Sequence, residues 1–594
     1  YRFYETAWHE LEQAQPGAGD AWYNAWRSSA DGRGTGVVYP FGYGLSYTTF
    51  TQEITNLTEQ DGIITVEVQV TNTGDVAGKD VVQIYFTAPY TDYDRENGVE
   101  KSYVNLIGFG KTSVLEPGAS ETVAVSFDRD DMASYAYRHA NADGTMGAYL
   151  LEAGTYTISC RKNAHELYAE SGCEEEYTLI SDVVFEGDEL RSSDRNGQSV
   201  MNDDGTYAAI AARSQYDSEA GYEPVNNKFE NLNDYMTDGT VTNLTRADWG
   251  SNPGEGSFPT TPNVVSEFVL DREGPVSNIL VKITDKEMSD AVLAEGSVST
   301  GGDHYDYEND PELGNVPTSE IYAAEAPVQG QDNGLKAIDL RGVDYYDPLW
   351  DDLLDQIDFT ADYEQIKQML FNHSYNTGAL DSVGFQEAKN FDGPVGLTKT
   401  MGAGSDASGA GACAWPSEVV VASTFNADLV EEQGRAIGEE AFQFQSGEGI
   451  YCNGWYAPGM DMHRSPFNGR NFEYYSEDPL LTGKMGAAVI TGAASKGLVT
   501  YMKHFVLNDQ ELMQKLAYTW CTEQTLREIY LRPYEIAVKE STMTLNYVED
   551  GQNATKVTRA TMGIMTSHNH IGATWVASSY SLLTEVVRGE WGFQ

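Results

Sequence analysis

Hydrophobic and polar positions alternate with two different periods along this chain of 594 residues. Between residues 45 and 186, short apolar runs alternate with polar positions, and turns rich in Gly or Pro separate them. The clearest run is Ile63–Val70, in which Ile64, Val66, Val68 and Val70 fall on one face of an extended chain. A period of two predicts half-buried strands, and short strands at this spacing predict an all-β sandwich.

From about residue 341 the pattern changes to amphipathic helical runs that alternate with short apolar strands. Helices are predicted at residues 427–445, 479–496, 523–540 and 579–589. Strands are predicted near Val419, Ile450, Val499 and Ile564. This alternation is typical of a parallel βα barrel. The alternation ends at Gln594 before a barrel can close, so we expect an incomplete one.

Two further stretches lack a clear period. Residues 1–44 begin with an aromatic run, continue through a helical stretch and end in a turn rich in Gly and aromatic residues. Residues 187–340 are rich in Asp, Asn, Gly and Ser and hold few long apolar runs. We interpret the second stretch as a polar connector with little regular structure.

The net charge of −54 excludes several classes of partner. Nucleic acids and anionic membrane surfaces would be repelled, whereas a neutral small molecule is unaffected. No run of roughly 18 apolar residues is present, so insertion into a membrane is not expected. The acidity favours a solubilising surface over an acidic face for a basic partner. The compartment and the oligomeric state, including a homo-oligomer, stay open.

The cysteines indicate neither a metal site nor a disulfide framework, because their spacing fits no pattern of either kind. They are Cys160, Cys173, Cys413, Cys452 and Cys521. No surrounding motif makes one of them a nucleophile. Cys160 and Cys173 could pair if the protein is exported.

The residues that suggest chemistry lie in the C-terminal half. Five phrases follow one another there: Asp392-Gly393-Pro394, Arg464-Ser465-Pro466, Gly469-Arg470-Asn471-Phe472-Glu473-Tyr474, Ser476-Glu477-Asp478-Pro479 and Lys503-His504-Phe505. A predicted strand, 498–502, runs directly into the last phrase, and the carboxyl ends of strands hold the chemistry of parallel barrels. In this order the phrases resemble the barrel domain of glycoside hydrolase family 3, the group that includes β-glucosidases.

The resemblance implies a domain order. Residues 1–44 resemble the tail of an α/β sandwich domain, residues 45–186 a fibronectin type III-like sandwich, and residues 341–594 a TIM-type barrel. Most members place the barrel first. The order here resembles that of circularly permuted members from bacteria of the gut and rumen.

The resemblance also implies an exo-acting, retaining β-glucosidase without a metal or an organic cofactor, whose substrate is a small carbohydrate. Its nucleophilic Asp is expected just after Gln594 and its acid/base Glu before Tyr1, so we expect no catalytic residue in this chain and no activity of it alone. Asp248 stands in an Asp-Trp-Gly phrase that resembles the family's nucleophile phrase, but it follows no apolar strand, so it is not expected to be the nucleophile. The N-acetylglucosaminidase branch of the family carries a His within a Lys-His-Phe-Pro-Gly-His-Gly loop. The loop 503–511 shares only the first three residues of that phrase, so this branch is disfavoured.

What remains resembles the sugar-binding half of the site. Asp392 is expected to accept hydrogen bonds from sugar hydroxyls, since a carboxylate accepts two charge-assisted bonds. Arg470, Lys503 and His504 resemble the cationic group that binds the sugar beside the cleaved bond. His568 stands where members often carry a Tyr near the nucleophile, so it joins the predicted substrate-binding residues.

Neighbouring polar residues are expected to serve structure. Glu473, Glu477 and Asp478 should pair with an Arg or cap the helix that begins near Pro479. Asp461 and His463 should belong to the scaffold.

Three departures from the family pattern leave the substrate open: Thr398 and Gln514, at positions where members often carry Arg, and His568. A β-xylosidase or another exo-β-glycosidase is the first alternative. A non-catalytic sugar-binding homologue is the second, and a purely structural cell-surface module is the third. The sugar and linkage preference, the aglycone and the role of the connector are not determined by the sequence.

Overall fold

The computed structural model describes residues 39–195 and 328–593, except for 170, 187–188, 344–346, 372–374, 399–411, 444–451, 465–467, 512–513, 517, 520, 550, 572–573 and 580. Most of the predicted sandwich tail, most of the predicted connector and Asp248 lie outside the described residues. The strand predicted near Ile450 also lies outside them.

The N-terminal part is built from antiparallel strands, as the alternating pattern predicts. Three sheets have the strand orders β1-β2-β5, β10-β8-β3-β4 and β11-β7-β6, with β9 paired to β8. The strands are β1 (Phe50–Gln60), β2 (Ile63–Asn72), β3 (Val81–Thr87), β4 (Asn105–Lys111), β5 (Ser120–Asp128), β6 (Ser134–Ala140), β7 (Met146–Leu151), β8 (Gly154–Asn163), β9 (Glu166–Leu167), β10 (Glu174–Leu179) and β11 (Val183–Phe185). Two short helices, α3 (Asp92–Asn97) and α4 (Ser192–Arg195), accompany them.

The core of this β-domain is formed by the apolar face that the sequence pattern marks. Ile64, Val66, Val68 and Val70 of β2 are all fully buried. They join one apolar cluster with residues of β3 and β8. Burial of a branched side chain contributes about 1.5–3 kcal/mol, so one register of β2 is strongly preferred.

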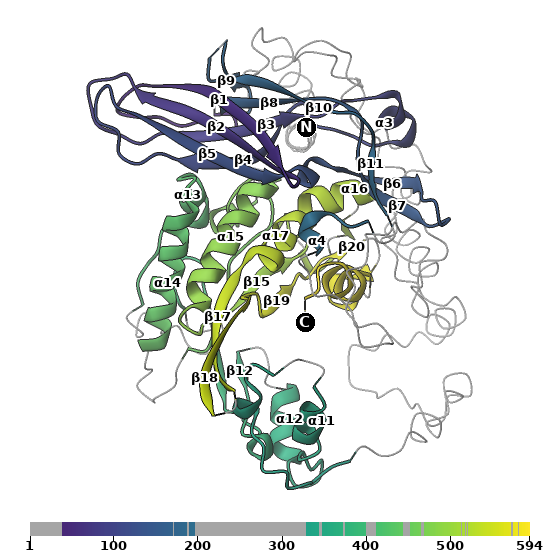
Figure 1. Cartoon of the computed structure of the whole chain (residues 1–594). Coiled ribbons are helices and arrows are strands. Elements are labelled where there is room, and N and C mark those ends of the chain that lie inside the picture. The colour runs from purple at the N-terminus through teal and green to yellow at the C-terminus, as the bar shows by residue number, and fades with distance from the viewer. Residues whose placement is uncertain are drawn as a thin grey trace, which may run out of the picture.

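The C-terminal part is organised around a five-stranded sheet with the order β12-β13-β14-β15-β19. The strands are β12 (Asn376–Thr377), β13 (Ala388–Asp392), β14 (Gly454–Tyr456), β15 (Val499–Phe505) and β19 (Gly563–Thr566). The last four pair in parallel, and β12 pairs with β13 in antiparallel orientation. Figure 1 shows this sheet beneath the β-domain. The predicted α/β architecture is therefore confirmed.

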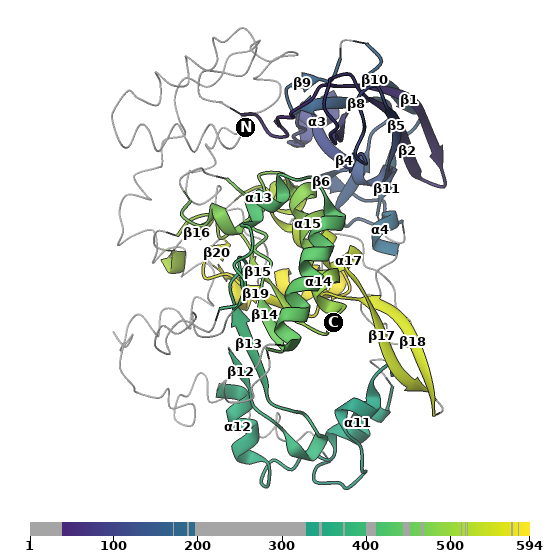
Figure 2. The same ribbon diagram turned by 90° about the vertical axis from the view of Figure 1, so that its left-hand side faces the viewer.

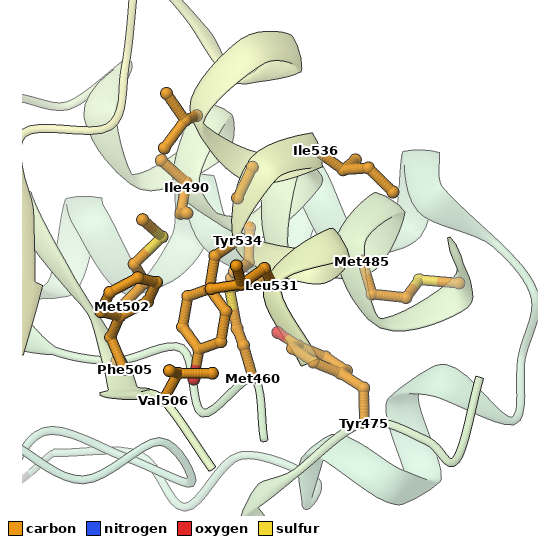
Figure 3. Close-up of a cluster of buried hydrophobic side chains, with 14 of the residues drawn as sticks. Met460, Tyr475, Met485, Ile490, Met502, Phe505, Val506, Leu531, Tyr534 and Ile536 are labelled. Carbon is orange, nitrogen blue, oxygen red and sulfur yellow. The ribbon is translucent and has the colours of Figure 1, made fainter. Parts of the chain in front are cut away.

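The predicted amphipathic runs form the helices α14 (Ala427–Gln443), α15 (Pro479–Ala494), α16 (Glu523–Thr525) and α17 (Arg532–Glu540). Helix α15 contacts β15 of this sheet, α14 and α17 pack on α15, and α16 lies against β6 of the β-domain. Figure 3 shows part of the apolar cluster between helices and sheet, in which Phe505 of β15 lies against Tyr534 of α17. Their ring centroids are 5.1 Å apart in an edge-to-face arrangement, which is favourable for aromatic pairs.

Two predicted helices contain wider turns. The run 523–540 is α-helical at both ends but π-helical at Leu526–Leu531. The last predicted helix is π-helical over Ser581–Glu590. A hydrophobic period does not distinguish these hydrogen-bond patterns from the α-helix, so the sequence could not predict them.

The strand predicted near Val419 is wrong, because residues Glu418–Ala422 form helix α13. A short apolar run fits a buried strand and a buried helix equally well. The sequence analysis also missed a hairpin, β17 (Thr542–Glu549) and β18 (Gln552–Arg559). Its signal was present, since alternating residues flank the dipeptide Asp550-Gly551.

Short elements complete the described part of the chain. They are α11 (Leu349–Leu354), α12 (Tyr363–Phe371), β16 (Tyr518–Thr519), β20 (His570–Ile571) and β21 (Thr574–Trp575). Helices α11 and α12 belong to a small apolar cluster of their own around Leu340, Leu353 and Leu380. Figures 1 and 2 both place them at the opposite end of the molecule from the β-domain.

A buried ion cluster joins the β-domain to helix α17. Arg191, which precedes α4, lies 2.5 Å from Glu535 and 3.0 Å from Asp194. Lys539 contacts both of these carboxylates. Burial alone would raise the pKa of Glu535, but the charges of Arg191, Lys539 and Arg532 lower it well below its usual value. The network therefore holds Glu535 ionised where the two parts meet.

We expect Glu535→Gln to lower the free energy of unfolding by about 3–5 kcal/mol, because it leaves buried cations without their counter-charge. Glu540→Gln is the matched control on the same helix. Glu540 pairs with Lys484 at the surface, so its loss should change stability by less than about 1 kcal/mol. Urea unfolding followed by circular dichroism measures both.

The same pair of proteins gives a test by pH. Glu535 has a lower pKa in the folded state than in the unfolded state, so its ionised form stabilises the fold above about pH 4.3. This stabilisation is lost as the pH falls through the folded-state pKa. The loss of stability on acidification should therefore be smaller in Glu535→Gln than in the parent protein. Equal acid sensitivity of the two proteins would contradict this account of the cluster.

Candidate functional site

The predicted polar residues meet at the carboxyl ends of neighbouring parallel strands. Asp392 is the last residue of β13 and stands opposite Tyr456, the last residue of β14. Lys503 and His504 lie near the end of β15, and Lys503 forms a parallel bridge with Gly459. Because strands in one parallel sheet point the same way, residues far apart in sequence converge at this edge.

Lys503 is the central group of the cluster. Its Nζ donates to Asp392 Oδ1 at 2.7 Å and lies 3.7 Å from Glu473 Oε2. The Lys503 side chain is 2% exposed, whereas that of Asp392 is 23% exposed. The ammonium is thus compensated by two carboxylates, and Asp392 presents part of its surface outward.

Arg470 adds a second cation that is partly open to solvent. It precedes the short turn η5 (Asn471–Glu473), and its Nε donates to the carboxylate of Glu473. A second nitrogen lies 3.6 Å from Glu511, and the side chain is 24% exposed. Burial lowers the pKa of Arg470, but Glu473, Tyr474 and Glu511 together raise it above its usual value. Arg470 is therefore a permanent donor beside Lys503.

His504 is held neutral beside these cations. Its Nδ1 lies 3.2 Å from the hydroxyl of Tyr474 and 3.5 Å from Asp461. Burial, followed by the charges of Arg470 and Lys503, lowers the pKa of His504 well below its usual value. A neutral imidazole offers one donor and one acceptor, which suits hydroxyl groups.

Asp461 fixes the backbone that carries His504. Its two carboxylate oxygens accept the N–H groups of His504, at 2.9 Å, and of Asn508, at 3.1 Å. Burial raises the pKa of Asp461 to about 7. His463 bonds in turn to the carbonyl of Tyr474 at 2.8 Å. These contacts agree with the scaffold role expected for Asp461 and His463.

Glu418 is a site-supporting residue that sequence reasoning missed. It lies in the first turn of α13, is 4% exposed, and accepts the N–H of Gly459 at 3.0 Å. A Cβ on Gly459 would lie 2.1 Å from the carbonyl oxygen of Glu473, so only glycine fits at position 459. Burial raises the pKa of Glu418 well above its usual value. The carboxyl group of Glu418 thus fixes the backbone at Gly459, the residue that pairs with Lys503.

Comparisons with known proteins assign this architecture. Residues 386–594 match the glycosyl hydrolase family 3 N-terminal domain, and residues 80–164 match the fibronectin type III-like domain. Residues 386–594 therefore form a domain of glycoside hydrolase family 3. The fibronectin-like domain precedes the family 3 domain, so the permuted order expected from the sequence is confirmed.

The family 3 relatives are similar over most of the chain. β-Glucosidase A of Butyrivibrio fibrisolvens is 27% identical over 94% of this chain and 55% of its own length. A β-glucosidase of Ruminococcus albus is 26% identical over 94% of this chain and 45% of its own length. The chain thus spans about half the length of these curated relatives.

A solved structure shares the fold. It is a β-glucosidase from Paenibacillus barengoltzii, with a TM-score of 0.57 and 24% sequence identity, and the match covers 94% of this chain and 48% of that one.

The family 3 domain brings four of the five predicted substrate-binding residues together. Asp392 pairs with Lys503, Glu473 links Lys503 to Arg470, and His504 follows Lys503 directly in the sequence. His568 is exposed and lies just beyond β19, the strand that neighbours β15. No contact ties it to the other four in the described structure, and its role in binding stays a prediction.

The residues expected to serve structure behave in two ways. Asp478 caps α15, where its side chain accepts the N–H of Leu481 at 2.8 Å. Glu473 pairs with Arg470 and Lys503, which is structural but also part of the site. Thr398 exchanges backbone hydrogen bonds with Asp392 and so closes the turn that follows β13.

The described residues include neither a candidate metal cluster nor a helix that could span a membrane. No group of three or more His, Cys, Asp or Glu side chains there is arranged to hold a metal ion. None of the helices in the described ranges is long and apolar enough to cross a membrane.

We expect Glu418→Ala to lower the free energy of unfolding by about 2–4 kcal/mol, because it leaves the N–H of Gly459 without its acceptor and creates a cavity. Glu418→Gln keeps an acceptor of the same shape and should cost less than about 1 kcal/mol. Thermal unfolding distinguishes the two substitutions. Equal losses would show that packing, rather than the bond to Gly459, gives Glu418 its importance.

Proposed function

We propose that the chain carries the sugar-binding half of an exo-acting β-glucosidase, which removes terminal non-reducing β-D-glucosyl residues with retention. The observation that carries the proposal is the cluster of Asp392, Lys503, Arg470 and His504 at one edge of the parallel sheet. The curated relatives of this chain from Butyrivibrio and Ruminococcus are β-glucosidases, which supports the same reaction class.

The roles follow from the chemistry of each group. Asp392 is partly exposed and accepts hydrogen bonds from two vicinal hydroxyls, since each oxygen of a carboxylate accepts separately. Arg470 donates to the sugar from the open side. Lys503 holds Asp392 in place and adds positive potential, and neutral His504 donates or accepts one bond.

Hydrolysis itself requires two further carboxyl groups. A retaining glycosidase needs a nucleophile and an acid/base roughly 5–5.5 Å apart. The carboxyl groups of this site are already engaged: Asp392 and Glu473 with Lys503, and Glu418 and Asp461 with backbone N–H groups. The proposal therefore assigns neither catalytic carboxylate to these four groups of the described site.

Glucose and xylose are both candidates for the sugar that this site binds. The two sugars differ in the substituent at C5, and the residues above contact hydroxyls that both sugars carry. A β-xylosidase is therefore the second candidate, because these hydroxyl contacts would serve both sugars.

We expect glucose to raise the thermal unfolding midpoint of this chain, and Asp392→Ala to abolish the shift. Losing charge-assisted bonds should weaken binding by a factor of about 10–100. Asp381→Ala is the matched control, since Asp381 is an exposed aspartate that bonds only to Gln365 and the chain near it among the described contacts. A shift that survives Asp392→Ala would contradict the assigned site.

We expect no hydrolysis of 4-nitrophenyl β-glucoside by the chain of 594 residues. The longer gene product, if it supplies both carboxylates, should hydrolyse the glucoside faster than the corresponding xyloside. Release of 4-nitrophenol measures both. Turnover by the shorter chain that is lost in Asp392→Ala would overturn the placement of the carboxylates, and faster xyloside cleavage would favour the second candidate.

A further inference from the structure

A pair of cysteines in the β-domain has no part in the site described above. Cys160 lies in β8, and Cys173 directly precedes β10. In the antiparallel pairing of these strands Glu174 stands opposite Ser159, and one further step of the same register places Cys173 opposite Cys160. The N–H of Cys160 donates to the carbonyl of Cys173 at 2.8 Å, which confirms that the two backbones are adjacent there.

The two side chains point to the same place. Cys160 Sγ lies 2.9 Å from the amide oxygen of Gln52, and Cys173 Sγ lies 3.3 Å from the carbonyl of the same residue. The two thiols are also close enough for each to shift the pKa of the other. Both residues are buried, with exposed fractions of 0% and 1%, and both are free thiols in this structure.

This geometry suits a covalent bond between the two sulfur atoms. Residues that face each other in an antiparallel pair have Cα atoms about 4.5–5.5 Å apart. Disulfides span Cα separations of about 4.4–6.8 Å, so no backbone movement is required. We propose that Cys160 and Cys173 form a site of reversible oxidation, which closes to a disulfide when a peroxide reaches the β-domain.

The reaction begins at Cys173. The neighbouring thiol of Cys160 lowers the pKa of Cys173 to about 7, whereas the Cys173 thiol, followed by burial, raises the pKa of Cys160. The Cys173 thiolate attacks one oxygen of hydrogen peroxide, forming a sulfenic acid and releasing hydroxide. Cys160 then attacks the sulfenic sulfur, the S–S bond forms, and water leaves. Two thiols and one peroxide thus give one disulfide and two waters, and a dithiol reductant reverses the change.

Two of the other cysteines provide a contrast within the same chain. Cys413 is exposed, and its hydrogen bond to Glu440 raises the pKa of its thiol. Burial raises the pKa of Cys452 to about 12. Neither shows the lowered pKa and the facing thiol that Cys173 has, so peroxide should join Cys173 to Cys160 rather than to either of them.

A disulfide between Cys160 and Cys173 would enclose the segment 161–172, which contains β9, in a covalent loop. A cross-link restricts the unfolded chain, so we expect the unfolding midpoint of the oxidised protein to rise by about 3–10 °C. The proposal does not depend on the sugar-binding function.

The test treats the full chain with hydrogen peroxide, blocks the remaining thiols under denaturing conditions, and maps the digest by mass spectrometry. The expected product is a peptide pair joined through Cys160 and Cys173, lighter by two hydrogen atoms than the two reduced peptides together. A dithiol reductant should restore both thiols. Cys452→Ser, a change at another buried cysteine, should leave the cross-link intact, and Cys173→Ser should abolish it.

Two results would overturn the proposal. In the first, Cys160 and Cys173 both remain blockable after a peroxide dose that oxidises Cys413. In the second, Cys173 is oxidised to sulfinic or sulfonic acid, or joined to a second chain, without bonding to Cys160. Both are read from the parent protein, so they do not depend on whether a variant folds.

Discussion

The ammonium of Lys503 is the group on which the site depends. Removing a charge of this kind from water costs several kcal/mol, so it remains buried only where carboxylates compensate it. Asp392 and Glu473 do so, and they come from β13 and from the turn η5, which are distant in sequence. The cluster therefore forms only when β13, β15 and the turn η5 are all in their native positions. Glu418 and Asp461 hold these positions through backbone N–H groups.

Much of this site could be predicted from the sequence, for a physical reason. Lys503 follows an apolar run, Asp392 begins the Asp-Gly-Pro phrase after a short strand, and the ends of parallel strands meet at one edge of a sheet. Glu418 could not be found in the same way. Its partner, Gly459, is 41 residues away, and the run Glu418–Ala422 suggested a strand where a helix forms. A buried carboxyl that bonds to a backbone N–H leaves no pattern in the sequence.

In the β-domain, too, local features could be predicted from the sequence and long-range contacts could not. The alternation in β2 predicted its strands and its buried face, because the period of a strand is a local property. Its attachment to the family 3 domain was not predicted, since Arg191, Glu535 and Lys539 carry no motif and become neighbours only on folding. Figure 2 shows α4 beside α17, where this contact forms. The attachment places the β-domain on the helices behind the sheet.

The most direct test of the central claim is a crystal structure of this chain soaked with glucose. We predict a sugar at the carboxyl ends of β13 and β15, with hydroxyls within hydrogen-bonding distance of Asp392 and Arg470 and the ion pair between Lys503 and Asp392 intact. A sugar bound elsewhere, for example on the β-domain, or no bound sugar at concentrations that saturate related enzymes, would contradict the assignment of this cluster as the sugar-binding site.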